Sequence, residues 1–303
     1  MEALLSLAFD NLSSYDGVKV RKGLRQVEGL LAQICLSGPQ PQRSARGRSR
    51  STGSDSSNEE GNGEGDGATA SRKDLAELSR DPAFREFFKL QEGFEWNVSM
   101  RLIGTLDRLM AKGGDGQNDL LILSSLDLIQ GVLLLHPPSK SLFSREQNMN
   151  LLLDLLEPYN CPAIQSATLL TLVVALIDTP SNTRTFESLD GLLTVTSLFK
   201  SRSTAREVKL KLVEFLYFYL MPEMPSIPRA DQRDSVPAML QRSPSKLAGA
   251  FSAADLSRKQ PDGDQEWMLT TEEKQELLSR HLSSVEDLVR DLRECAPFGG
   301  VIS

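Results

Sequence analysis

The sequence contains few of the residues on which most enzymes depend. Of its 303 residues only two are histidines, His136 and His281, and three are cysteines, Cys35, Cys161 and Cys295. The cysteines stand far apart and form no C-x-x-C pair, so no zinc or redox motif is present. We expect reduced, buried or half-exposed thiols in a reducing compartment. We predict no metal ion and no cofactor.

Recognisable catalytic motifs are missing as well. The chain has no Walker sequence, no kinase His-Arg-Asp triplet and no dinucleotide-binding glycine pattern. A cysteine phosphatase needs an arginine six residues after its cysteine, and the residues at that position are Pro41, Ala167 and Val301. Phosphatase chemistry of that type is therefore ruled out. We predict no catalytic residue, and an enzyme of unrecognised type is the least favoured of three hypotheses.

Long apolar runs and excess positive charge are also lacking. The formal net charge is −7, which argues against general nucleic-acid binding because that depends on a basic face. The longest apolar run in the core, Leu169–Ile177, ends at Asp178 and falls short of the ~20 residues that span a bilayer. We expect it to be a buried helix. Met1–Leu5 lacks the basic start of a signal peptide, and Asp10 interrupts the apolar stretch that follows.

Helical repeats organise the centre of the chain. Residues 181–220 contain three apolar segments with helical spacing, separated by Asp190-Gly191 and by a polar turn. The third segment is apolar on most sides, so we expect it to be buried on most sides. The three predicted helices cover 181–188, the residues from the Asp190-Gly191 break to about Phe199, and 205–220.

The same order of helices occurs earlier in the chain. Residues 151–156 correspond to 192–197 and residues 164–177 to 208–221, and 97–135 form a weaker third copy. A helix-turn-helix period in the low forties is typical of armadillo and HEAT repeats. We therefore predict an all-α fold, an armadillo/HEAT-like helical solenoid with two disordered insertions. A generic helical bundle is the alternative.

Composition divides the chain into five regions. Two of them lack apolar periodicity and are predicted to be disordered, because no burial offsets the entropy of ordering them. The predicted regions are an N-terminal helical pair packing on the solenoid (1–37), a disordered linker (38–72), an armadillo-like helical core (73–221), a second disordered linker (222–265), and C-terminal amphipathic helices (266–303).

Both predicted linkers carry a candidate phosphorylation site. Arg46-x-Arg48-x-x-Ser51 suits a basophilic kinase, although an ordinary solvated linker is the simpler interpretation. Ser243 meets the S-P-x-K pattern of cyclin-dependent kinases. Phosphorylation there would add about −1.5 to −2 charges.

The C-terminal region carries two capping boxes. Thr270 with Glu273, and Ser283 with Glu286, each place a hydroxyl and a carboxylate at the spacing that opens a helix. The helices that follow are amphipathic, so their apolar stripe must be buried. We expect this region either to dock on the solenoid or to bind a partner.

Several extended phrases resemble one known family, the fungal cell division control protein 14 family of the septation initiation network. This family is unrelated to the phosphatase of the same name. The resemblance covers both ends and the core but not the two linkers. The phrases are Phe186-Glu187-x-x-Asp190-Gly191-Leu192, Glu207-Val208-Lys209-x-Lys211, Glu214-Phe215-Leu216-Tyr217-Phe218-Tyr219-Leu220, Glu273-Lys274-Gln275-x-Leu277-Leu278 and Val285-Glu286-Asp287-Leu288-Val289.

The resemblance implies a non-catalytic partner of a germinal-centre-type protein kinase, recruited from the cytoplasm to the spindle pole body to support septum formation and cytokinesis. Spindle-pole scaffold proteins are further candidate partners. From the residues themselves, scaffolding by the long third helices is the compatible mechanism. Solvent-facing Lys209, Lys211 and Glu214 are our candidate contacts, with an ordinary solvated face equally favoured. An armadillo-type adaptor for another peptide cargo is the alternative function.

Overall fold

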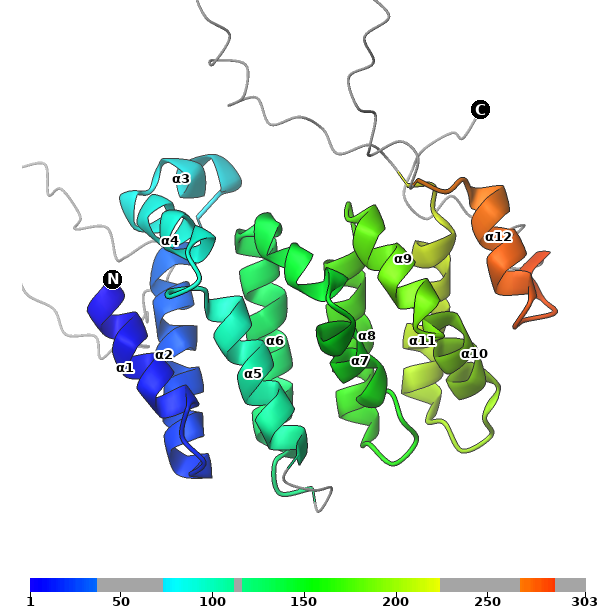
Figure 1. The fold of residues 1–303 in the computed structure, drawn as a ribbon, viewed down its shortest axis with the longest axis horizontal. Coiled ribbons are helices and arrows are strands. Elements are labelled where there is room, and N and C mark those ends of the chain that lie inside the picture. Colours follow the sequence, from blue (N-terminus) through cyan, green and yellow to red (C-terminus); the bar gives the residue numbers. More distant parts are fainter. Residues whose placement is uncertain (37–72, 112–115, 224–267, 287–303) are drawn as a thin grey trace, which may run out of the picture. The chain divides into compact units, whose positions relative to one another are not determined.

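All the regular elements that the structure describes are helices, which confirms the all-α class (Figure 1). The computed structural model describes residues 1–36, 73–111, 116–223 and 268–286. The predicted linker 38–72, most of 222–265, and the candidate sites Ser51 and Ser243 lie outside these residues. Contacts divide the chain into two compact units, Met1–Asn97 and Val98–Ser303.

The first unit is built on the expected N-terminal helix pair. Its two helices pack on each other along buried apolar stripes. Gly23 allows their close approach, since a Cβ at this position would lie 2.9 Å from the backbone nitrogen of Leu12. The helices of this unit are α1 (Glu2–Leu12), α2 (Gly17–Cys35), α3 (Leu75–Arg80) and α4 (Pro82–Glu92).

Contacts between distant parts of the sequence complete the first unit. The backbone N–H of Lys73 donates to the carbonyl of Cys35, so the chain re-enters the unit beside the end of α2. Trp96 stacks on Phe9 with ring centroids 6.3 Å apart. These contacts group residues 73–97 with the N-terminal pair, whereas the sequence had assigned them to the core that begins at residue 73.

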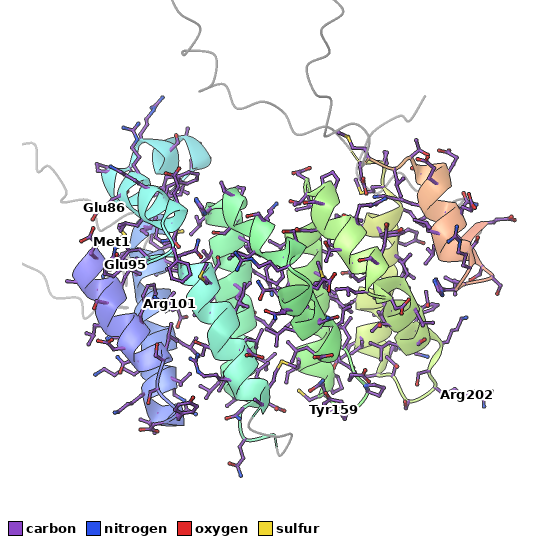
Figure 2. All side chains as sticks on the ribbon, in the orientation of Figure 1. Met1, Glu86, Glu95, Arg101, Tyr159 and Arg202 are labelled. Atoms are coloured by element: carbon purple, nitrogen blue, oxygen red, sulfur yellow. The ribbon has the colours of Figure 1, made fainter. Side chains whose placement is uncertain are left out.

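The aromatic cluster near α4 divides between the interior and the surface. Phe87 is fully buried, as expected for a core position, while Phe94 is exposed. Asp81 caps the start of α4, because its side chain accepts a hydrogen bond from the N–H of Ala83 and Pro82 is the first helical residue. Glu86 of α4 also binds the N-terminus, since one of its carboxylate oxygens lies 3.1 Å from the ammonium of Met1 (Figure 2).

The second unit repeats a pattern of short helices followed by a long one. The long helix α6 packs on α8, and α8 packs on α11, so the long helices lie in a row behind the shorter ones (Figure 1). The helices are α5 (Val98–Ala111), α6 (Asp119–Leu135), η1 (Pro137–Ser144), α7 (Glu146–Asp154), α8 (Pro162–Leu176), α9 (Pro180–Ser188), α10 (Gly191–Lys200), α11 (Arg206–Leu220) and α12 (Thr271–Ser279).

Helices α9, α10 and α11 occupy the ranges that the apolar spacing predicts to within about a residue. Between α9 and α10, Asp190 has a positive φ of 58°. Gly191 follows it where no side chain fits, because a Cβ would lie 2.4 Å from the ring of Phe186. That ring is buried, and its centroid lies 5.6 Å from the ring centroid of Phe215 in α11. The Asp190-Gly191 break therefore lets α9 and α10 fold tightly around one aromatic side chain.

A buried asparagine joins three elements of this unit. The Nδ2 of Asn182 in α9 donates to the carbonyl of Lys140 in η1 at 2.8 Å and to the carbonyl of Ala175 in α8 at 2.7 Å. The last carbonyls of a helix lack partners within the helix itself, so Asn182 satisfies one of these for α8. Its side chain ties consecutive helices of the row together.

Candidate binding groove

A groove of about 680 Å³ lies between α8 and α11 in the second unit. Its walls are mostly apolar, and its far end is closed by the turn after α8, the turn after α11, and one residue of α12. The lining residues are Leu169, Leu170, Val173, Leu176, Ile177, Asp178, Thr179, Pro180, Thr183, Lys211, Glu214, Phe215, Tyr217, Phe218, Tyr219, Met221, Pro222, Glu223 and Lys274.

The wall formed by α8 carries no charge, because no Asp, Glu, Lys or Arg occurs between Pro162 and Leu176. Several of its side chains nevertheless face solvent. Leu170 is 42% exposed and Ile177 39%, and across the groove Met221 is 38% exposed. The expectation that Leu169–Ile177 is a buried helix is therefore wrong for one face of α8. Leu169 and Leu176 are buried as expected.

Two of the three candidate contact residues line this groove. The Nζ of Lys211 and a carboxylate oxygen of Glu214 form an ion pair at 2.7 Å on the exposed side of α11. The third, Lys209, is half-buried and does not line the groove. The role of all three in partner binding stays a prediction.

Asp178, in the turn after α8, lines the groove in a conformation that few residues adopt. It has a positive φ of 56°, the left-handed region that Asp and Asn tolerate better than most residues. Beside it, the Nζ of buried Lys140 donates to the carbonyl of Ile177 at 3.0 Å. Burial lowers the pKa of Lys140, and the negative charge of Asp178 partly opposes that shift. The turn after α8 is thus held in place and presents an exposed carboxylate.

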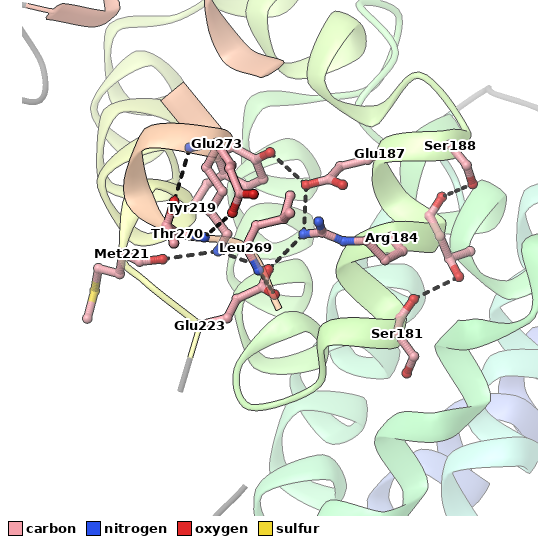
Figure 3. Close-up of polar contacts among 12 residues, drawn as sticks. Ser181, Arg184, Glu187, Ser188, Tyr219, Met221, Glu223, Leu269, Thr270 and Glu273 are labelled. Atoms are coloured by element: carbon pink, nitrogen blue, oxygen red, sulfur yellow. Dashed lines mark hydrogen bonds and ion pairs between the residues drawn. The ribbon is translucent and has the colours of Figure 1, made fainter. Parts of the chain in front are cut away.

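A cluster of charged residues closes the end of the groove (Figure 3). Glu223 lies at its centre, 2.7 Å from the guanidinium of Arg184 and 3.1 Å from the Nζ of Lys274. Glu187 pairs with Arg184 at 3.0 Å and accepts a 2.6 Å hydrogen bond from the Tyr219 hydroxyl. Two cations and two carboxylates therefore balance one another in a mostly buried site.

Burial dominates the ionisation of this cluster. It raises the pKa of Glu187 although the Tyr219 hydroxyl and Arg184 oppose the shift. It also raises the pKa of Tyr219, with the negative charge of Glu187 adding to the effect. The pKa of Lys274 is lowered by burial, against the attraction of Glu223. Burial therefore disfavours the charged forms of Glu187 and Lys274, and their partners offset only part of that cost.

The same cluster attaches α12 to the rest of the unit. The N–H of Leu269 donates to a Glu223 carboxylate oxygen at 3.0 Å, and the Nζ of Lys274 donates to the carbonyl of Met221. The predicted capping box is confirmed, since Thr270 and Glu273 each accept a hydrogen bond from the other's backbone N–H. The apolar stripe of this segment is buried at Leu278, Leu282 and Val285. The C-terminal region thus docks on its own chain, one of the two expected outcomes.

The chain matches the family described as "Cell division control protein 14, SIN component" over residues 1–298. The chain belongs to this family. A relative from Schizosaccharomyces pombe, "Cell division control protein 14", is 29% identical over 221 residues, which cover 70% of this chain and 78% of the relative. No solved structure matched the chain.

Membership supports a role in septation initiation and confirms the resemblance to the network component rather than to the phosphatase. The second predicted capping box, Ser283 with Glu286, lies at the last described residues, and the helix expected after it lies beyond them.

No reactive constellation is visible in this family member's described residues. Over 1–36, 73–111, 116–223 and 268–286, no three His, Cys, Asp or Glu side chains gather in a way that would hold a metal ion. His136 is buried with its Nδ1 2.8 Å from the Ser139 hydroxyl, which is a structural contact. Burial raises the pKa of the Cys35 thiol, which disfavours a reactive thiolate. None of the described helices is both long and apolar enough to cross a membrane.

The sequence did not reveal the charged cluster. Glu223 falls in the range that composition assigns to a linker, yet it makes the central contacts. Lys274 belongs to a helix start with an ordinary polar pattern, and Arg184 precedes Glu187 by three residues like many exposed pairs. No signal within one sequence connects residues so far apart in the chain.

Proposed function

We propose that this protein is a non-catalytic scaffold or regulatory subunit that binds a germinal-centre-type protein kinase in septation initiation signalling. Through that complex it supports septum formation and cytokinesis. It acts in the cytoplasm and is recruited to the spindle pole body, where spindle-pole scaffold proteins are candidate partners.

The observation that carries this proposal is the apolar groove between α8 and α11. An uncharged helix face with exposed leucine and isoleucine is costly in water unless another surface covers it. Grooves of this kind accept apolar side chains from a partner's helix or extended segment. Family membership supplies the process, and the groove supplies a place for a protein partner.

A binding role also agrees with the chemistry of the chain. The sequence has two histidines and none of the enzyme motifs sought above. The buried charges pair with one another and hold α12 in place; they are Arg184, Glu187, Glu223 and Lys274. An arrangement of paired, buried charges stabilises structure rather than activating a substrate.

Co-purification tests the proposal. The protein is isolated at its native level from dividing cells, and its partners are quantified by mass spectrometry. We expect one kinase of the germinal-centre type in stoichiometric amount, and reconstitution of the same complex from the two purified proteins. A mixed set of cargo proteins would instead support the peptide adaptor. Hydrolysis of phosphoesters or nucleotides by the purified chain alone would overturn both binding roles.

A further inference from the structure

We propose that the partner enters the α8–α11 groove with an amphipathic segment whose apolar side chains cover Leu170 and Ile177 and whose basic side chain meets Asp178. Docking of α12 is required for this, because α12 completes the groove. The inference rests on the proposed function and adds to it the chemistry of the segment that the groove takes.

The shape and polarity of the groove define the apolar part of this segment. Its volume of about 680 Å³ falls in the range of roughly 300–1,000 Å³ typical of ligand sites. Leu170 and Val173 of α8, three positions apart, line the groove together with Ile177, the residue that follows the last helical residue Leu176. A partner helix with apolar residues spaced by three, four and seven positions would match such a stripe.

The charges around the groove define the polar part. Five charged side chains line it, and four of them form two pairs, Lys211 with Glu214 and Lys274 with Glu223. The fifth, Asp178, is exposed and forms no ion pair within 4.0 Å among the described residues, and the only cation on which its charge is seen to act there is buried Lys140, which does not line the groove. The lining therefore carries one surplus negative charge. An incoming lysine or arginine is attracted there, whereas an acidic segment is repelled.

The same charge pattern argues against a second copy of this chain as the occupant. Two grooves facing each other would bring two Asp178 carboxylates together. Every cation that lines the groove is already paired, so none is left to meet them. Like charges placed together across an interface oppose association. A partner that brings its own cation fits better.

The dependence of partner binding on α12 follows from which residues line the groove. Lys274 of α12 and Met221 in the turn after α11 both contribute to its closed end, and the Nζ of Lys274 donates to the carbonyl of Met221 at 3.0 Å. Undocking α12 removes one lining side chain, and it takes away one of the two cations that pair with Glu223, the other being Arg184. The groove therefore exists in its closed form only while the C-terminal segment is in place.

Binding of the purified kinase to full-length variants tests the apolar part. Leu170→Glu puts a charge in the groove, and Leu193→Glu makes the same change on α10 at a leucine of matched exposure, 42% against 46%, outside the groove. We expect Leu170→Glu to weaken binding by about tenfold or more and Leu193→Glu to leave it nearly unchanged. Leu170→Ser serves as a milder variant if the glutamate disturbs folding, which circular dichroism reports.

The polar part has its own matched pair. Asp178→Asn and Asp190→Asn remove one charge each from an exposed aspartate with positive φ, and only the first lies in the groove. We expect Asp178→Asn to weaken binding by about threefold to tenfold and to reduce its dependence on salt, while Asp190→Asn does neither. Equal behaviour of the two would overturn the assignment of a basic partner residue.

The role of α12 is tested with Glu223→Gln, using the exposed α12 residue Glu276→Gln as control. Glu223→Gln should weaken kinase binding by about as much as Leu170→Glu, because the closed end of the groove is lost. Kinase binding that is equal in wild type, Leu170→Glu and Glu223→Gln would overturn this inference and leave the proposed function intact. No kinase binding by the wild type would overturn both. A wild-type dimer that Leu170→Glu dissociates, measured by light scattering, would assign the groove to a second copy instead.

Discussion

Two neighbouring regions of the second unit reverse the usual distribution of polarity. The face of α8 is free of charge yet partly exposed at Leu170 and Ile177. The seam formed by Arg184 and Glu187 of α9, Glu223 after α11 and Lys274 of α12 holds two cations and two carboxylates, and it is largely closed to solvent. Exposed apolar surface is usually covered by a partner, and buried charge is retained where its partners are fixed.

The difference separates two kinds of attachment. The seam is specific but weakly stabilising, because desolvation of the four charges offsets much of their mutual attraction. The face of α8 offers a larger driving force but little specificity, since apolar contact is not directional. A protein that holds its own C-terminal segment by charges therefore keeps its apolar face for another molecule.

The largest effect is expected from Glu223→Gln, which breaks the seam. Removing one member of a buried charge cluster leaves the others without compensation, at a cost of about 3–5 kcal/mol. We expect backbone amides of α12, Thr271–Ser279, to exchange with deuterium much faster, while those of α11 change little. Glu276→Gln on the exposed side of α12 is the control. Unchanged exchange in α12 would show that apolar contacts such as Leu278 hold it without the charges.

The buried amide of Asn182 is a neutral group with which the cost of breaking the charged seam can be compared. Asn182→Ala removes two hydrogen bonds and leaves the carbonyls of Lys140 and Ala175 without that partner. We expect the free energy of unfolding of the whole unit to fall by about 2–4 kcal/mol, measured by denaturant titration. Asn160→Ala removes a single exposed bond to the carbonyl of Asp154 and should cost less than about 1 kcal/mol. Equal losses would show that burial does not set the cost.

A smaller effect is expected on the pH dependence of stability, through the buried carboxyl of Glu187. The pKa of Glu187 is raised in the folded protein, so folding takes up protons between the ordinary glutamate pKa, about 4.3, and the raised value. Its contribution to the free energy of unfolding therefore falls as the pH rises through that window. The free energy of unfolding of wild type minus that of Glu187→Gln should therefore fall as the pH rises toward neutral, measured in parallel denaturant titrations. A difference that grows with pH would mean that Arg184 outweighs burial.

The smallest effect is expected on the face of α8. Leu170→Ala should change the free energy of unfolding by less than about 0.5 kcal/mol, because the side chain already meets water in the free protein. Leu172→Ala, two residues away and fully buried, should cost about 2–5 kcal/mol. Thermal or chemical unfolding of the two variants measures both. A large loss for Leu170→Ala would show that the groove is part of the core.

Local signals in the sequence were sufficient for most helices of the fold. The spacing of Val208, Leu212, Phe215 and Tyr219 marked α11, and Asp190-Gly191 marked the break before α10, because periodicity and backbone freedom act over a few residues. The N-terminal pair and the first capping box followed from the same kind of signal.

The candidate site depends on contacts that local patterns do not contain. An apolar position on α8 has the same sequence signature whether it faces the core, like Leu169, or solvent, like Leu170. The pairing of Glu223 with Lys274 joins residues on either side of a long segment, and only the folded chain brings them together. Lys211 and Glu214 were found at the groove because a charged pair on a mostly apolar helix marks its open side.

Hydrogen bonds between backbone groups join the described residues on either side of the two longer internal gaps, 37–72 and 224–267. The N–H of Lys73 meets the carbonyl of Cys35, and the N–H of Glu223 meets the carbonyl of Leu269. For a flexible chain inserted between ends that are pinned side by side, the entropy cost of closure grows only with the logarithm of its length, about 0.6 kcal/mol for each doubling. Both positions are therefore natural sites for length variation and for inserting a reporter domain without disturbing the helices.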